Sequence, residues 1–258
     1  MENIFANLDL NTVLFLIVTG FVACFIDSTV GGGGLISAPA LLSLGFPVPF
    51  VLGTNKLGST MGALMSVVSF WRAGKINKTV LYLMPLSVVG SVAGTCVVYL
   101  LPEKILKNII VLLLVIVAVY TYRRKDWGDV SSVKVLGAKA FSAAMAMALG
   151  IGFYDGFFGP GTGTFLIFGF LFLGYNFLTA AGNAKALNFA SNMGALISFA
   201  YNGTIMWGYG LIMGTAMIAG AVFGTRLAIK KGAAYIRPLY LIVTTLLIGK
   251  QVYEILFK

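Results

Sequence analysis

A lysine followed by amide side chains at helical spacing is the pattern in this chain most able to bind a ligand. Lys185, Asn188 and Asn192 are separated by three and seven residues, which places them near one face of a helix. Amide groups donate hydrogen bonds, and the lysine adds a positive charge, so together they suit a small oxyanion. We expect these three residues to bind substrate; the alternative is that the asparagines only bond across helices.

A related group of polar residues lies in the first half of the chain. Lys56 matches Lys185 at an offset of 129 residues, and Ser59 follows it by one helical turn. We expect the same site to include the polar residues beside the two lysines, namely Thr54, Asn55 and Asn183.

Two glycine-rich breaks interrupt apolar segments at matching places, over residues 27–34 and 155–163. In membrane proteins, paired Gly/Pro interruptions in corresponding halves point to the binding site of a transporter. Unwound backbone there exposes N–H and C=O groups, and helix N-termini favour anions. We therefore expect a substrate held between the breaks, in contact with Gly33, Gly34, Gly161 and Gly163.

Four charges fall within apolar segments: Asp27, Lys56, Asp155 and Lys185. Each would cost about 2.5–3.5 kcal/mol at a membrane helix centre, so they must pair or face a wet cavity. The chain has no histidine, so a proton-coupled cycle would need a carboxylate, and Asp27 and Asp155 are the candidates. The alternative is that the lysines and aspartates are ion pairs that hold the halves together.

The composition places the whole chain in a membrane. It is 59% hydrophobic and 10% charged, whereas soluble domains have about 25% charged residues. We expect one transmembrane domain, 1–258, with internal repeats 12–122 and 135–257. The apolar runs are 12–30, 35–44, 50–71, 79–101 and 105–122, then 135–158, 164–173, 177–201, 209–229 and 236–257.

Several function classes are disfavoured by the same residues. Without histidine or a nucleophile–base pair, we expect neither an enzyme nor a metal site, and the two cysteines lie in separate apolar runs as packing residues. The glycine runs lack a following Gly-Lys-Ser/Thr, so no nucleotide or other cofactor is expected. The net charge of +10 lies mainly in short connections, so no nucleic-acid partner is expected.

The expected fold is an all-α polytopic membrane protein with two inverted repeats. The run 35–44 is about 15 Å long as a helix, half a bilayer, so each repeat would hold a glycine-broken half-membrane hairpin plus three spanning helices. Lys and Arg concentrate in 72–78, 123–139 and 226–237. By the positive-inside rule these face the cytoplasm, and the N-terminus is extracytoplasmic in a prokaryotic inner membrane.

The chain resembles the sulfite exporter TauE/SafE family. In the first half the resemblance rests on the glycines 31–34, on residues 39–41 and on the Gly-Thr-Asn-Lys sequence 53–56. In the second half it rests on residues 159–163 and 182–192, although Ile167 stands where the family usually has a proline. The resemblance implies a secondary transporter, often an exporter, of small sulfur-containing anions such as sulfite, thiosulfate or sulfonates, with protons as the coupling ion. An anion channel and an uptake permease for a small organic anion remain alternatives.

Overall fold

The computed structural model describes residues 8–102, 104–105, 109, 112 and 137–231. These residues form eight α-helices and one short 3-10 helix, and they contain no strand, so the all-α prediction is confirmed for them. The elements are α1 (Leu10–Val30), α2 (Gly34–Leu42), α3 (Val48–Arg72), η1 (Lys78–Tyr82), α4 (Met84–Leu100), α6 (Ala138–Phe157), α7 (Thr162–Phe172), α8 (Phe177–Tyr201) and α9 (Trp207–Lys231).

Three described helices, α1, α6 and α9, are long and apolar enough to cross a membrane. Helices α3 and α8 have 25 residues each but bury lysines and asparagines among their apolar residues. The expected segment 236–257 and the connection 123–134 lie outside the described residues, as does 105–122 apart from three positions.

The expected span 79–101 is divided in the structure. Residues 78–82 form η1, whose first turn is capped by the Asn77 side chain accepting from Thr79 N at 2.9 Å. The α-helix begins only at Met84, with Pro85 in its first turn. Proline fixes φ and lacks an N–H, so it suits the start of a helix rather than its interior.

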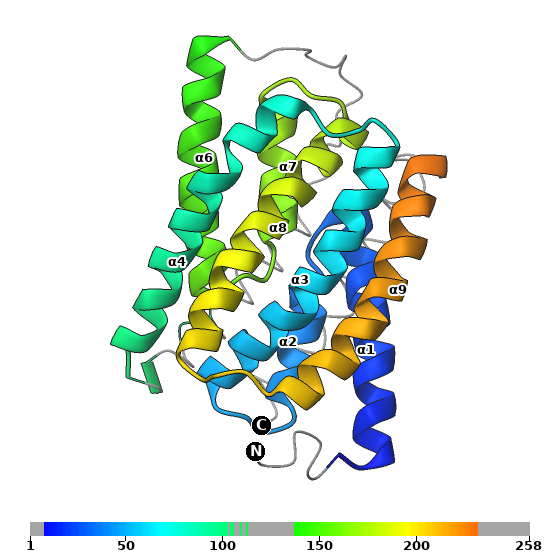
Figure 1. Ribbon diagram of the computed structural model, residues 1–258, viewed down its shortest axis with the longest axis vertical. Coiled ribbons are helices and arrows are strands. Elements are labelled where there is room, and N and C mark those ends of the chain that lie inside the picture. The colour runs from blue at the N-terminus through cyan, green and yellow to red at the C-terminus, as the bar shows by residue number, and fades with distance from the viewer. Residues whose placement is uncertain (1–7, 103, 106–108, 110–111, 113–136, 232–258) are drawn as a thin grey trace.

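Helices α3 and α8 lie side by side at the centre of the bundle, with α1 and α9 on one side and α4 and α6 on the other (Figure 1). The two central helices run antiparallel. Gly53, near the start of α3, packs against Thr204 beyond the end of α8, and Gly182, near the start of α8, packs against Lys75 beyond the end of α3. In Figure 1, α1, α3 and α9 run upward while α4, α6 and α8 run downward.

Matching glycines make matching contacts in the two halves. Gly90 on α4 lies against the backbone of Leu149 on α6, and its match Gly220 on α9 lies against Phe21 on α1. A methyl group at either position would overlap a carbonyl oxygen. Small residues therefore let these helix pairs approach at the backbone, as expected for membrane helices.

Both glycine-rich breaks end one helix and begin another. Helix α1 stops at Val30, where Gly31 and Gly32 have φ of 78° and 87° before α2 starts. Between α6 and α7, Gly159 and Gly161 have φ of 96° and 87°. Residues with a Cβ rarely adopt these left-handed conformations, which explains the glycines.

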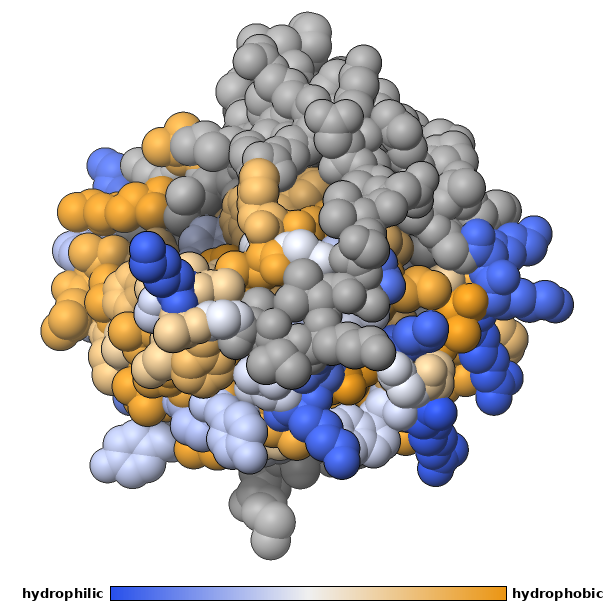
Figure 2. Space-filling view, turned by 90° about the horizontal axis from the view of Figure 1, so that it is seen from above, coloured by the Kyte–Doolittle hydropathy of each residue, from blue (hydrophilic) through white to orange (hydrophobic). Residues whose placement is uncertain are grey.

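One end of the bundle is basic. It is the upper end of Figure 1, seen face-on in Figure 2, where blue side chains surround a largely apolar body. The described residues of this end include Arg72, Lys75, Lys78, Lys139, Arg226, Lys230 and Lys231. At the other end Asp9 caps α1, and its carboxylate accepts from Thr12, which lowers the pKa of Asp9.

Candidate functional site

The two glycine-rich breaks meet inside the molecule, although they lie in different halves of the sequence. Gly31 packs against Gly163, and Gly34 packs against Pro160. The Thr164 hydroxyl donates to the carbonyl oxygen of Val30 at 3.3 Å. The helix ends freed by the breaks therefore share one region of the core.

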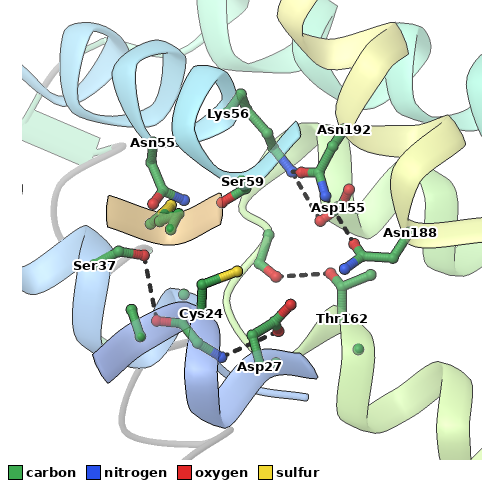
Figure 3. Close-up of a pocket in the computed structure, with 17 residues that line it drawn as sticks. Cys24, Asp27, Ser37, Asn55, Lys56, Ser59, Asp155, Thr162, Asn188 and Asn192 are labelled. Carbon is green, nitrogen blue, oxygen red and sulfur yellow. Dashed lines mark hydrogen bonds and ion pairs between the residues drawn. The ribbon is translucent and has the colours of Figure 1, made fainter. Parts of the chain in front are cut away.

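A small pocket lies at this meeting point (Figure 3). Its cavity of about 30 Å³ has room for about two water molecules or an ion of similar size. Its walls come from α1, α2, α3, α8, α9 and both breaks. The lining residues are Ala23, Cys24, Asp27, Gly33, Gly34, Ser37, Asn55, Lys56, Ser59, Asp155, Gly159, Gly161, Thr162, Gly163, Asn188, Asn192 and Met217.

Lys56 is the cation that lines the pocket, and its residue is 2% exposed. Its Nζ lies 2.8 Å from Oδ1 of Asp155 and donates to Oδ1 of Asn192 at 2.9 Å. Asn192 in turn donates through Nδ2 to Oδ1 of Asn188 at 3.0 Å. An ammonium group has three N–H donors, so these two described contacts leave one N–H of Lys56 for a ligand. Figure 3 shows Asn188 and Asn192 reaching from α8 toward Lys56 on α3.

Lys185 is wholly buried and does not line the pocket. Its Nζ lies 2.5 Å from Oδ2 of Asp27, and the other carboxylate oxygen, Oδ1, accepts from Gly33 N at 3.2 Å. Each lysine is thus paired with the aspartate of the other half of the chain. Asp27 therefore lines the pocket, and Lys185 contacts Asp27 without lining the pocket itself.

The four charges of these two pairs add up to zero, since Lys56 and Lys185 balance the half-buried Asp27 and the buried Asp155. Removing one partner of a buried pair leaves an unpaired charge, which costs about 3–5 kcal/mol. The pairs therefore hold the two halves together around the pocket, as the structural alternative anticipated, while Lys56 keeps a donor toward the cavity.

Thr54 and Asn183 lie outside the pocket, where they make matching structural bonds. Thr54 Oγ1 accepts from Met206 N at 3.0 Å, and Asn183 Oδ1 accepts from Asn77 N at 2.8 Å. The two side chains occupy equivalent positions in the repeat, as do the two backbone donors, at the same offset of 129 residues. Each therefore ties down the connection that follows a central helix of the other half.

Ten of the expected site residues line the pocket: Asp27, Gly33, Gly34, Asn55, Lys56, Asp155, Gly161, Gly163, Asn188 and Asn192. The structure adds several that the sequence did not single out, among them Cys24, Ser37, Thr162 and Met217. Cys24 lies one helical turn before Asp27, and this spacing could have placed it at the pocket. Nothing in the sequence pattern indicates that Ser37 and Met217 line the pocket. No group of three His, Cys, Asp or Glu side chains able to hold a metal occurs in the described part of the chain.

Comparisons with known proteins agree with one another. The family model described as Sulfite exporter TauE/SafE matches residues 16–250. The chain is 40% identical to the probable membrane transporter protein ORF9 of Sinorhizobium sp, over 92% of this chain and 91% of that protein. It is 36% identical to a probable membrane transporter protein of Haemophilus influenzae over 96% of both chains, and 33% identical to the probable membrane transporter protein YfcA of Escherichia coli over 94% and 89%. No solved structure gives a significant match.

Proposed function

The chain belongs to the sulfite exporter TauE/SafE family of membrane transporters, and from this premise we propose that it is a secondary transporter of small sulfur-containing oxyanions. The proposed substrates are sulfite, thiosulfate or small sulfonates. The observation that carries the proposal is a small cavity, lined by both glycine-rich breaks, into which a buried lysine can donate a hydrogen bond.

The donor groups of the pocket support an oxyanion. Lys56 offers a charged N–H, while Asn188, Ser59 and Thr162 offer amide and hydroxyl groups. Helix α7 begins at Thr162, so its first turn adds the positive end of a helix dipole. The cavity volume favours an ion of a few heavy atoms over a nucleotide or a sugar.

The proposed arrangement in the membrane is a pair of inverted repeats, each with a half-membrane hairpin formed at its break. Support comes from the matching glycine contacts, from the matching bonds of Thr54 and Asn183, and from the opposite directions of α3 and α8. The basic end would face the cytoplasm of a bacterial inner membrane, with the start of α1 on the opposite side.

Export coupled to protons is the proposed mode of transport. The titratable groups at the pocket wall that suit this role are Asp27 and Asp155, because each lies on a glycine-rich break and pairs with a lysine. An anion channel would use the same positive site without a saturable exchange step, and an uptake permease would differ in direction alone.

A binding panel tests the substrate class. Purified protein in detergent would be titrated with sulfite, thiosulfate, sulfoacetate and the carboxylate succinate, and the shift in unfolding temperature would be measured. We expect saturable stabilisation by at least one sulfur oxyanion and none by succinate. Stabilisation by succinate alone would assign the site to a carboxylate permease, and no stabilisation by any anion would contradict the proposal.

A further inference from the structure

The two matched aspartates differ in their bonding, and from this difference we propose that Asp155 alone accepts the proton that accompanies an anion into the pocket, while Asp27 remains an ionised anchor for Lys185. This inference rests on the proposed function and assigns unequal roles to two residues that the sequence makes equivalent.

Charge balance requires a proton at the pocket. The empty site is neutral, because the two lysines offset the two aspartates. A bound thiosulfate dianion would add two uncompensated negative charges to a poorly solvated cavity, which is strongly unfavourable. One proton taken up with the anion removes one of these charges, and the N–H and O–H donors of the pocket stabilise the other. The proton acceptor must be a carboxylate at the pocket wall, because Lys56 already carries a positive charge.

Both carboxylate oxygens of Asp27 already accept a hydrogen bond. Its Oδ2 is bound by Lys185 and its Oδ1 accepts from the backbone N–H of Gly33. A proton on Asp27 would remove the negative charge that pairs with the buried ammonium of Lys185. Its bonds therefore connect Lys185 to the backbone of the first break and fix the geometry of that break.

Asp155 has one oxygen that is buried and without a hydrogen-bond partner, Oδ2, while Oδ1 is bound by Lys56. A buried carboxylate oxygen without a donor is costly as an anion. With a proton on Oδ2 the group is neutral, still accepts from Lys56 through Oδ1, and gains an O–H that can donate to a substrate oxygen. The proton arrives from the solution on the loading side and leaves to the solution on the release side.

The surroundings of the two lysines explain why the pairs are unequal. Asn192 accepts from Lys56, so this ammonium stays hydrogen-bonded when the charge of Asp155 is neutralised. The residue equivalent to Asn192 in the first half is Ala63, which offers Lys185 no acceptor side chain. Lys185 therefore depends on an ionised Asp27.

The other ionisable groups near Asp155 do not offer a better acceptor. The neighbouring Tyr154 on α6 donates its hydroxyl to the carbonyl of Pro160 at 2.6 Å. Cys24 on α1 is a thiol in the pocket wall, and Lys56 on α3 is already a cation. The polar side chains of α4 and α8 that form hydrogen bonds near the end of α6 are hydroxyl and amide groups, which do not titrate: Ser91, Thr95, Asn188 and Asn192.

Proton uptake on binding tests the assignment directly. Thiosulfate would be mixed with purified protein in weakly buffered detergent solution containing a pH indicator, after binding has been established separately by the unfolding-temperature shift. Thiosulfate stays ionised near neutral pH, so any proton consumed goes to the protein. We expect wild type to take up about one proton per bound anion, with a dissociation constant that falls about tenfold per pH unit lowered.

Matched variants distinguish the two carboxylates. Asp155→Asn imitates the protonated acid, so it should bind thiosulfate with no proton uptake and no pH dependence, whereas Asp27→Asn, where it binds, should still take up about one proton. Proton uptake that survives Asp155→Asn, or wild-type binding without proton uptake, would overturn the assignment. Wild type that binds none of the panel anions would instead overturn the proposed function, and this inference with it.

A measurement on the unmodified protein covers the case in which Asp155→Asn does not fold. Infrared difference spectra of wild type should gain a protonated carboxyl band when thiosulfate is added, and Asp155→Glu, which retains an acid, should gain a shifted band. Thiosulfate binding without such a band in wild type would overturn the proposal.

Discussion

Lys56 Nζ lies 2.8 Å from Oδ1 of Asp155, so a lysine of the first half of the chain neutralises an aspartate on the glycine-rich break of the second half. Lys185 and Asp27 make the reciprocal pair. The two pairs connect α3 to the end of α6 and α8 to the end of α1, and thereby hold both breaks against the pocket. The ion pairs thus border the pocket as well as connecting the helices.

Removing one member of the first pair should destabilise the protein more than removing both. Lys56→Met leaves Asp155 buried without a cation, and the free energy of unfolding should fall by about 3–5 kcal/mol. Lys56→Met combined with Asp155→Leu removes both charges, so it should recover most of this loss. Thermal unfolding in detergent measures the difference, and a double variant less stable than Lys56→Met would contradict the pairing.

A methyl group at the contact of α6 with α4 should loosen the bundle. A Cβ at Gly156 would overlap the carbonyl oxygen of Ser91, so Gly156→Ala should lower the free energy of unfolding by about 1–3 kcal/mol. Gly150 on the same helix has no atom within 4 Å of its Cβ position and serves as the control. Equal unfolding temperatures for Gly156→Ala and Gly150→Ala would show that this close approach is absent.

The pocket amide and the structural amide of α8 should respond differently to truncation. Asn188 lines the pocket, and hydrogen bonds to charged groups contribute about 1.5–3 kcal/mol. Asn188→Ala should therefore weaken thiosulfate binding about 10- to 100-fold. Asn183→Ala, which removes the bond to Asn77 N outside the pocket, should lower stability and leave the dissociation constant within about twofold of wild type. Isothermal titration measures the dissociation constants of both variants, and thermal unfolding measures their stability. Weakened binding by Asn183→Ala with unchanged binding by Asn188→Ala would contradict the proposed position of the site.

Labelling of single cysteines tests the inverted arrangement in the membrane. Ala73 follows α3 at the basic end, and Asn202 follows α8 at the opposite end. In a background without Cys24 and Cys96, an impermeant maleimide added to intact cells should label Asn202→Cys, and should label Ala73→Cys only after lysis. Labelling of both positions from the same side would instead indicate parallel repeats.

Much of the helical framework could be predicted from hydropathy and glycine placement. The helix α8 spans 177–201 as expected, because a long apolar run is bounded by turn residues on both sides. The division of residues 79–101 was missed, since Pro85 and the capping role of Asn77 leave the mean hydropathy of the run unchanged. The start of α4 is therefore set by Pro85 and by the cap at Asn77, and not by hydropathy.

The site was predictable in its residue types and less so in its geometry. Lys56 and Lys185 are equivalent in the repeat, yet of the two only Lys56 lines the pocket. Lys56 also donates to Asn192, whose equivalent in the first half is Ala63. Thr54 and Asn183 were expected at the site, but they lie outside the pocket and bond to backbone N–H groups of two connections. Helices α3 and α8 are packed on almost every face, so periodicity cannot distinguish a pocket-facing polar residue from one that ties down a loop.

Exchange of thiosulfate by reconstituted protein tests the central claim most directly. Proteoliposomes loaded with unlabelled thiosulfate would be diluted into radiolabelled thiosulfate, and the uptake of label would be followed. Wild type should accumulate label transiently and saturably. The double variant Lys56→Met/Asp155→Leu keeps the pocket neutral but lacks its cation. Its initial rate should be at least about 10-fold lower than that of wild type, because one hydrogen bond from a charged group to the anion is lost. Exchange by the double variant at the wild-type rate would contradict a binding site built around Lys56.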